Sequence, residues 1–304
     1  MSIDIIGPEA EALLSWDGLL QALIEGHHLP RAEIGDTLLY RGKDTLLNRA
    51  AWIDGLGQLV KTATIFPGNT DLGKPSVNGA VTIYDDETGE LGALVDFHLV
   101  TKWKTAGDSL LAARKLARQD SRSFLIIGAG TVARSMAEAY RSAFPKAHIA
   151  FWNRSSDGAK RAADAMEAVA VSDLPRAVAE ADVICTATMS HDPVLLGEWL
   201  RPGTHVDLIG AYRPDMREAD DEALQRSRLF VDSRATTIHH IGELMDPIAR
   251  GVISEGDVVA DFYDIPKGSF VRRSPDEITI AKNGGGAHLD LMTAAYILRA
   301  WRGR

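Results

Sequence analysis

The stretch that decides the fold of this chain reads Ser123-Phe-Leu-Ile-Ile-Gly-Ala-Gly-Thr-Val-Ala-Arg-Ser-Met-Ala-Glu-Ala-Tyr140. Residues 124–127 form an apolar run with the length of a strand that is buried on both faces. Gly128, Gly130 and Ala133 follow with the spacing G-x-G-x-x-A, and helix-forming residues come next. We therefore predict a strand, a glycine turn and a helix in that order, which is what a dinucleotide site requires.

Each glycine of this turn has a separate physical task. Gly128 allows the tight turn, and Gly130 lets the backbone approach a pyrophosphate. The start of the helix, with Thr131 and Val132, offers unpaired N–H groups and a partial positive charge to the phosphates. An ordinary buried turn is the alternative interpretation, but the flanking strand and helix favour a cofactor site.

The composition is that of a globular protein large enough for two domains. The chain has 304 residues, of which 45% are hydrophobic and 25% charged. A net charge of −9 without a basic block argues against a nucleic-acid partner. The single cysteine, Cys185, excludes an intrachain disulfide and fits a reducing compartment. We find no signal-peptide pattern and no long apolar stretch, so we expect a cytoplasmic protein without a membrane segment.

The order of the predicted elements indicates two kinds of domain. Residues 9–26 have helical periodicity, short strands follow between about residues 36 and 100, and residues 104–118 are helical again. Beyond residue 123, strands alternate with helices; the strands are predicted at 123–128, 147–152, 182–187, 204–209 and 228–232, and the helices at 131–143, 156–168, 173–180 and 218–227. Residues 278–281 read as a further strand and 289–301 as a helix, and this tail lies outside the alternation.

This order predicts an α/β protein in which one domain is inserted into the other. A Rossmann-type, doubly wound parallel sheet would span residues 119–271. Residues 1–118 and 272–304 would together form a second, α+β domain for substrate binding and dimerisation.

The residues after the second strand of the alternation bear on the choice of dinucleotide. An NAD site usually has an acidic residue there, which bonds the ribose 2′-hydroxyl. This chain has Asn153, Arg154 and Ser155 instead. Arg154 can pair with a 2′-phosphate, which a carboxylate would repel. We therefore expect NADP(H) to be preferred with NAD(H) possible, although a solvated loop arginine is the simpler alternative.

Two further strand ends are expected to face the cofactor, because ligands bind at the carboxyl ends of parallel strands. The first carries Thr186, Thr188 and Met189, and the second carries Ile209 and Gly210. Small and hydroxyl-bearing residues would let a dinucleotide pass closely, although each could also be a plain strand end.

Basic residues outside the nucleotide domain are the candidates for binding an anionic substrate. Lys61 lies within an otherwise apolar strand, where it must point outward or have a buried anionic partner. Lys104 and Lys102 are expected near the start of a helix, where the helix dipole disfavours a cation. We assign Lys61 and Lys104 to a substrate carboxylate, treat Lys102 as surface charge, and add Asn78 and Gly285, from the run Gly284–Gly286, as substrate-binding candidates. The nine histidines show no metal-binding spacing.

Several stretches together resemble the ornithine cyclodeaminase/μ-crystallin family. They are Lys61-Thr-Ala-Thr, Val100-Thr-Lys-Trp-Lys-Thr-Ala, Ile127-Gly-Ala-Gly-Thr-Val-Ala, Trp152-Asn-Arg-Ser, Ala181-Asp-Val-Ile-Cys-Thr-Ala-Thr-Met, Gly197-Glu-Trp-Leu-Arg-Pro-Gly-Thr-His and Arg213-Pro-Asp-Met-Arg-Glu. The resemblance implies an inserted Rossmann domain, a homodimer, NAD(P)(H) and substrates that are imines or amines beside a carboxylate. It puts the family's carboxylate-binding lysine on Lys61. Lys104 stands where the family has an arginine, and Arg31, Arg41 and Arg49 are all possible counterparts of an upstream arginine.

The departure at Tyr212 narrows the expected chemistry. The resemblance implies an aspartate in this loop in cyclodeaminases and in the alanine dehydrogenase, but the chain reads Gly210-Ala-Tyr-Arg-Pro. Without that base, removing the proton from an ammonium before hydride leaves becomes difficult. We therefore expect NAD(P)H-dependent reduction of a small cyclic imino acid, with Δ1-pyrroline-2-carboxylate giving L-proline as the first choice. The alternatives are an acyclic imine such as iminosuccinate, ornithine cyclodeamination, or a protein that binds NADPH and a small ligand without turnover.

Overall fold

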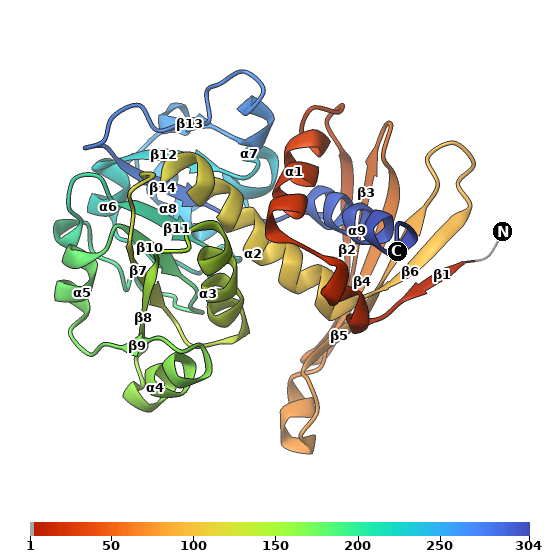
Figure 1. Ribbon diagram of the computed structural model, residues 1–304, viewed down its shortest axis with the longest axis horizontal. Helices are drawn as coiled ribbons and strands as arrows, with labels where there is room; N and C mark the ends of the chain where they lie inside the picture. The colour runs from red at the N-terminus through yellow and green to blue at the C-terminus, as the bar shows by residue number, and fades with distance from the viewer. Residues whose placement is uncertain (1–2) are drawn as a thin grey trace. The chain divides into compact units, whose positions relative to one another are not determined.

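The structure is a computed structural model that describes residues 3–304, and the chain divides into two compact units (Figure 1). The first consists of residues up to Thr105 together with Gly286–Arg304. The second is Ala106–Gly285. The long helix α2 (Phe97–Leu116) begins in the first unit and ends in the second.

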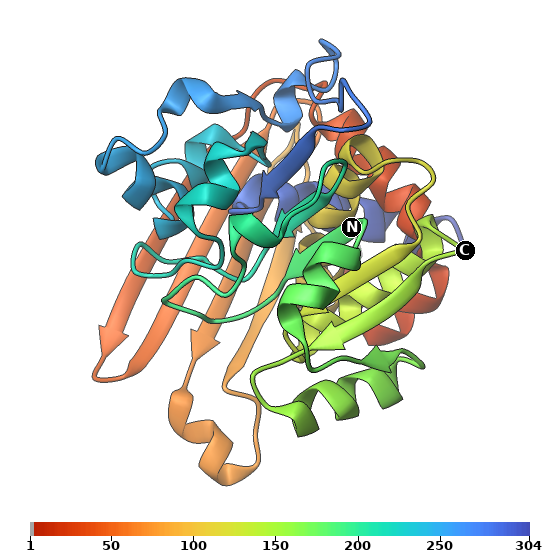
Figure 2. The same ribbon diagram turned by 90° about the vertical axis from the view of Figure 1, so that its left-hand side faces the viewer.

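The first unit is built on a six-stranded sheet with the order β1-β6-β5-β4-β3-β2. Neighbours from β2 to β6 pair antiparallel, and β1 pairs parallel with β6. The strands are β1 (Asp4–Ile6), β2 (Glu33–Arg41), β3 (Asp44–Ile53), β4 (Gly57–Ile65), β5 (Val77–Tyr84) and β6 (Leu91–Asp96). Figure 2 shows β2 to β5 as long neighbouring strands.

The C-terminal helix α9 (Ala287–Arg302) packs against this sheet and against α1 (Trp16–Gly26). In β4 the odd-numbered positions Leu59, Lys61 and Ala63 are buried, and the positions between them are only half-buried. This alternation with period two is the pattern of a sheet with one covered face. The position of Lys61 on the covered face is what makes it unusual.

Two helices of the first unit begin elsewhere than predicted. The expected helix over residues 9–26 is split into a 3₁₀ segment, η1 (Pro8–Leu13), and α1, because Ser15 is extended and its Oγ caps α1 by accepting from the Gly18 N–H at 3.1 Å. Helix α2 begins at Phe97, where Asp96 accepts from the Leu99 N–H at 2.7 Å. Lys104 therefore lies well inside the helix, and the prediction that it opposes the dipole at a helix start was wrong.

The second unit is built on an eight-stranded parallel sheet with the order β13-β12-β14-β11-β10-β7-β8-β9. Its strands are β7 (Ser123–Ile127), β8 (His148–Trp152), β9 (Val169–Ala170), β10 (Val183–Thr186), β11 (His205–Leu208), β12 (Ser227–Val231), β13 (Val258–Ala260) and β14 (Ile278–Lys282). The helices include α3 (Thr131–Ala143), α4 (Ser156–Ala165), α5 (Leu174–Glu180), α6 (Asp221–Gln225), α7 (Arg234–Thr237) and α8 (Gly242–Ala249). The predicted doubly wound parallel sheet is confirmed.

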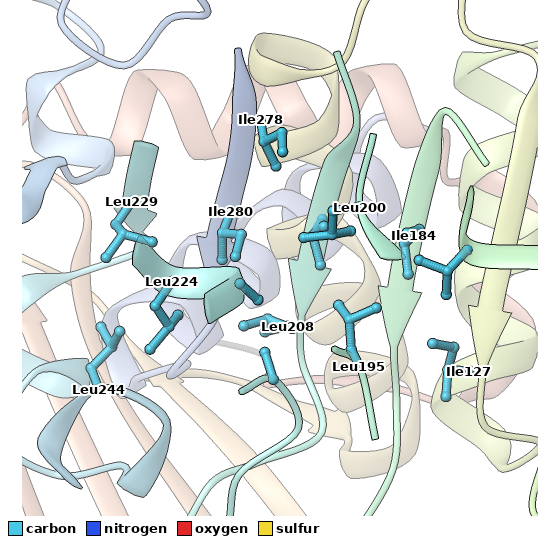
Figure 3. Close-up of a cluster of buried hydrophobic side chains, with 14 of the residues drawn as sticks. Ile127, Ile184, Leu195, Leu200, Leu208, Leu224, Leu229, Leu244, Ile278 and Ile280 are labelled. Atoms are coloured by element: carbon cyan, nitrogen blue, oxygen red, sulfur yellow. The ribbon is translucent and has the colours of Figure 1, made fainter. Parts of the chain in front are cut away.

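Helices cover both faces of this sheet because alternate residues of each strand are apolar on both sides. On one face the ring of Phe124 contacts that of Tyr140 from α3, with 5.1 Å between the centroids. On the other face Ile127, Ile184 and Leu208 join a large apolar cluster with side chains from α5, α6 and α8 (Figure 3). This packing holds the carboxyl ends of β7, β10 and β11 in one row.

The strand at residues 278–282 differs from the expected arrangement. We expected it to return to the first domain with the C-terminal helix, but β14 pairs in parallel with both β11 and β12. Ile278 and Ile280 contribute to the same apolar cluster (Figure 3), which explains why this position is favourable. Among the helices of residues 3–304, none is both long and apolar enough to span a membrane.

Candidate active site

The glycine turn after β7 lies in close contact with the ends of β8 and β10. Gly128 has a φ of +129°, which L side chains rarely adopt. A Cβ placed on it would lie 2.4 Å from the carbonyl oxygen of Ala187, in the loop after β10. The Gly128 N–H donates to the carbonyl of Trp152, at the end of β8, at 2.8 Å. Both the conformation and the lack of space thus require glycine at this position.

Gly130 differs from Gly128 because it leaves open space. It is the N-cap of α3, no side chain caps the helix there, and a Cβ on it would meet no atom within 4 Å. The first N–H groups of α3, from Thr131 and Val132, therefore lie at an uncapped helix start beside an open backbone. This geometry fits a pyrophosphate, since it combines free donors with the positive end of the helix dipole.

The loop after β8 carries the residues predicted to select the dinucleotide. Ser155 is the N-cap of α4, and its Oγ accepts from the Gly158 N–H at 3.3 Å. Asn153 Nδ2 donates to the Ser155 carbonyl at 3.2 Å, which shapes the turn. Arg154 is exposed and makes no ion pair within residues 3–304. Its guanidinium is therefore available to an anion, whereas Asn153 and Ser155 already have structural contacts.

The loops after β10 and β11 are joined by a buried carboxylate that the sequence analysis did not assign. Glu218 Oε1 accepts from the backbone N–H and hydroxyl of Thr188, at 2.8 and 2.7 Å. Its Oε2 accepts from the N–H groups of Gly210 and Ala211, at 2.6 and 3.1 Å. Glu218 is the last residue of the quoted run Arg213-Pro-Asp-Met-Arg-Glu, so its position was available as a signal although its contacts were not.

A second buried layer supports these loops. Glu243 accepts from the N–H groups of Glu218 and Ala219, at 2.8 and 3.0 Å. Burial is the main cause that raises the pKa of Glu243 to about 7. The buried Lys282 donates to the carbonyls of Leu208 and Ala211, at 2.9 and 2.7 Å, and burial lowers its pKa. The loop after β11 is therefore held by two buried groups, the Glu218 carboxylate and the Lys282 ammonium.

The remaining cofactor candidates differ in their surroundings. Thr186 is fully buried, and its Oγ1 has no hydrogen-bond partner among residues 3–304. Met189 is 73% exposed, and Ile209 is half-buried. A Cβ on Gly210 would lie 2.1 Å from the Thr188 carbonyl oxygen, so this residue must be glycine for the two loops to touch. The close contacts at Gly128 and Gly210 bring the loops together at these strand ends, and this arrangement fits a dinucleotide that passes over them.

In the first unit, Lys61 forms a buried ion pair. Its Nζ lies 2.8 Å from Asp290 Oδ1 on α9, and the two side chains are 8% and 0% exposed. The same Nζ lies 4.9 Å from the centre of the Phe97 ring. Burial lowers the pKa of Lys61, and the charge of Asp290 opposes this effect. The buried anionic partner that the sequence analysis required for an inward-facing lysine is therefore Asp290.

Two other cations act on Lys61. Lys104 and Arg49 both lower its pKa by charge repulsion, and Arg49 lies directly opposite Lys61 in the pairing of β3 with β4. Arg49 also pairs with Asp36 at 2.8 Å. Of the three upstream arginines considered, Arg49 thus shares the face of Lys61, whereas the Arg41 side chain is 80% exposed and pairs with Asp44. Lys102 pairs with Glu11 at 2.8 Å.

Of the two other substrate candidates, Asn78 belongs to the first unit and Gly285 to the second. Asn78 pairs with Thr64 in the sheet, three residues along from Lys61, so the alternation places it on the opposite face. The Gly285 N–H donates to Asp232 Oδ2 at 2.5 Å, within the second unit. Its φ of +68° explains the glycine without a ligand.

Two buried histidines border the cluster, His27 at the C-cap of α1 and His288 on α9. The rings of His27 and His288 meet edge to face, with 5.8 Å between the centroids. Burial lowers the pKa of His27 to about 4 and that of His288 to about 3. Both are therefore neutral at physiological pH. Across residues 3–304, no group of three or more His, Cys, Asp or Glu side chains is arranged to hold a metal ion.

Comparisons with known proteins agree on one family. The family model "Ornithine cyclodeaminase/mu-crystallin family" matches residues 54–304. The Δ1-pyrroline-2-carboxylate reductase of Paracoccus denitrificans is 51% identical over 302 residues, covering 97% of this chain and 96% of that protein. The solved structure of the Thermococcus litoralis Δ1-pyrroline-2-carboxylate reductase in complex with NADH and L-proline is 26% identical, with a TM-score of 0.89 over 99% of this chain and 98% of that one. An archaeal alanine dehydrogenase dimer with bound NAD is 30% identical, with a TM-score of 0.90 over 100% and 97% of the two chains.

Proposed function

The chain belongs to the ornithine cyclodeaminase/mu-crystallin family, and we propose that it is an NAD(P)H-dependent reductase that converts Δ1-pyrroline-2-carboxylate to L-proline. The observation that carries this proposal is the 51% identity, over nearly the whole of both chains, to a reductase of that name. The loop residue Tyr212 supports the same choice, because a preformed imine needs no base to release a proton from an ammonium.

In the proposed reaction, the imine carbon accepts a hydride, which an NAD(P)H held at the cofactor site would supply on becoming NAD(P)+. The π electron pair of the C=N bond moves to nitrogen, which stays in the ring as the secondary amine of proline. This nitrogen carries its proton from the start as an iminium or receives it from water. Lys61, Lys104 and Arg49 hold the substrate carboxylate by charge. Holding the reacting atoms at attack distance is the main contribution of the chain's own residues.

The proposed cofactor site comprises the glycine turn, the start of α3 and the loops after β8, β10 and β11. The forced glycine at 128 and the open backbone at Gly130 support it. We propose that NADPH is preferred over NADH, because Arg154 is exposed and free to pair with a 2′-phosphate.

We also propose that the protein is a homodimer whose interface includes the face of the first sheet opposite α9. Every residue of β2 is exposed, and Leu39, Trp52 and Leu94 are 58%, 52% and 37% exposed. Pairing of Leu39 with Leu46, and of Trp52 with Gln58, places these side chains on the face opposite Lys61. Ile34, Leu38 and Tyr40 of β2 are also exposed, on the other face of this edge strand. Exposed apolar residues at this part of the sheet favour a protein partner, and the archaeal relative described as a dimer supports a second copy.

The experiment that tests the function is oxidation of NADPH and of NADH, followed by absorbance, with Δ1-pyrroline-2-carboxylate, its six-membered homologue and iminosuccinate in turn. We expect the five-membered imine to have the highest kcat/KM. Tight NADPH binding without oxidation by any imine would contradict the reductase and favour a binding protein. Release of ammonia from ornithine would restore the cyclodeaminase alternative.

A pair of variants tests the role of Lys61. Lys61→Met should lose turnover while its affinity for NADPH is retained. Lys102→Met, which removes a surface pair with Glu11, should keep its turnover.

A further inference from the structure

We propose that Asp290 is a positioning residue of the substrate site, which holds the Lys61 ammonium in place and keeps it charged among neighbouring cations. This inference rests on the proposed function, because it concerns how the reductase would bind its substrate carboxylate. Asp290 does not itself contact the substrate; it acts through Lys61.

The contact between the two groups is short and almost free of water. Asp290 lies in the first turn of α9, and its Oδ1 is 2.8 Å from Lys61 Nζ on β4. Asp290 is 0% exposed, and its Oδ2 has no hydrogen-bond partner among residues 3–304. A buried carboxylate with one unsatisfied oxygen costs stability, and a buried ion pair can often be replaced by apolar residues without loss. Stability alone therefore does not explain this pair.

The charges around Lys61 indicate that Asp290 keeps the lysine protonated. From β3, Arg49 lies opposite Lys61, and from α2, Lys104 repels it; the paired residue on β5 is the apolar Val81. The nearby His288 and His27 carry no charge at neutral pH because burial lowers the pKa of both. Burial, Lys104 and Arg49 all lower the pKa of Lys61, and Asp290 is the acidic group that raises it. Removing Asp290 would therefore leave the lysine with every influence favouring its neutral form.

A neutral lysine would bind a carboxylate far less well than an ammonium. The ammonium has three N–H donors, and Asp290 occupies one of them. The other two face the Phe97 ring or make no hydrogen bond within residues 3–304, so they remain for a ligand. Asp290 also offsets one of three clustered cations, which reduces the repulsion of an iminium bound through its own carboxylate.

The test is the pH dependence of kcat/KM for Asp290→Asn, measured from pH 6 to 9.5. At the acid end, kcat/KM of the variant should be close to that of the wild type. Above the pH at which Lys61 loses its proton, kcat/KM should fall tenfold for each pH unit. This fall should begin at least one pH unit lower in the variant than any such fall in the wild type. The double variant Lys61→Arg/Asp290→Asn should lose this pH dependence, because a guanidinium stays charged. Glu11→Gln, which removes a surface ion pair of the same unit, is the control and should keep the wild-type profile.

A second measurement needs no activity and so separates this inference from the proposed function. The lysine Cε carbons are labelled with ¹³C, and the Lys61 signal is identified by its absence in Lys61→Arg. Its midpoint of titration should fall by more than one pH unit in Asp290→Asn. An unchanged midpoint, or a pH profile of Asp290→Asn parallel to that of the wild type, would overturn the role of Asp290. If Asp290→Asn does not fold, Asp290→Glu replaces it, and its midpoint should stay near that of the wild type while KM rises more than kcat falls.

Discussion

We propose that the Arg154 side chain selects between two nearly identical cofactors. It follows β8 at the place where a carboxylate would exclude a 2′-phosphate, and its guanidinium is exposed. A charge-assisted hydrogen bond contributes about 1.5–3 kcal/mol, and 1.4 kcal/mol corresponds to a tenfold change in affinity.

We therefore expect Arg154→Asp to raise the KM for NADPH at least tenfold and to change the KM for NADH little. Initial rates with each cofactor measure both values. Lys160→Asp, an exposed charge reversal on α4, is the matched control and should affect neither cofactor strongly. Equal losses with NADPH and NADH would refute the assigned role of Arg154.

The buried imidazole of His27 is expected to make the free energy of unfolding depend on pH in the acid range. Its pKa falls from 6.5 to about 4 in the folded protein, chiefly through burial. Between these two values the unfolded chain binds more protons than the folded chain, so the stabilising contribution of the neutral histidine is lost as the pH falls below 6.5.

The free energy of unfolding should show this effect in a comparison of the wild type with His27→Gln. As the pH decreases from 6.5 towards 4, the wild type should lose up to about 1.4 kcal/mol per pH unit more than the variant. Urea unfolding at pH 7, 6 and 5 measures the difference. His28→Gln, at the exposed neighbouring position, should follow the wild type; a parallel course for His27→Gln would contradict the assignment.

Among the elements, the loops after β10 and β11 depend on one carboxylate. Glu218 accepts two hydrogen bonds from Thr188 and one each from Gly210 and Ala211. A glutamine there would turn an N–H₂ group towards backbone N–H donors, so at least one of the two loops would lose its anchor.

We expect Glu218→Gln to raise the KM for the dinucleotide several-fold to tenfold and to lower the Tm by several degrees. Steady-state kinetics and thermal unfolding are the measurements. Glu222→Gln is the matched control, since this half-exposed side chain pairs with Arg226 at 3.3 Å on the neighbouring helix α6. If Glu218→Gln lowers the Tm but leaves the cofactor KM unchanged, the loops are not part of the cofactor site.

At the scale of the whole molecule, the uncovered sheet face of the first unit predicts the oligomeric state. Leu39 is an exposed apolar residue on the fully exposed edge strand β2. A charge at this position would have to be buried without a partner if a second copy covers the face.

Leu39→Asp should therefore shift the protein towards a monomer, which light scattering after size-exclusion chromatography measures as a halved mass. Val169→Asp, at an equally exposed apolar position on β9 of the second unit, should leave the mass unchanged. A wild-type mass equal to that of one chain, or a dimer that persists in Leu39→Asp, would argue against the proposed interface.

Local patterns in the sequence determined the strands and helices of the second unit and the residues expected to bind the cofactor. The apolar run 124–127, the glycine spacing and the strand–helix rhythm depend on neighbouring residues, so they predict β7, α3 and the parallel sheet. The same is true of Arg154, whose position is set by the end of β8. The Tyr212 departure is visible once this loop is set beside the family that the chain resembles.

Contacts between distant parts of the chain were decided only by the tertiary structure. Asp290 meets Lys61 across 229 residues, and Glu218 joins two loops that no periodicity connects. The insertion of β14 between β11 and β12 depends on apolar packing with strands far away in sequence. A short motif specifies its own backbone, but the partner of a buried charge and the neighbour of a strand depend on which surfaces the whole fold brings together.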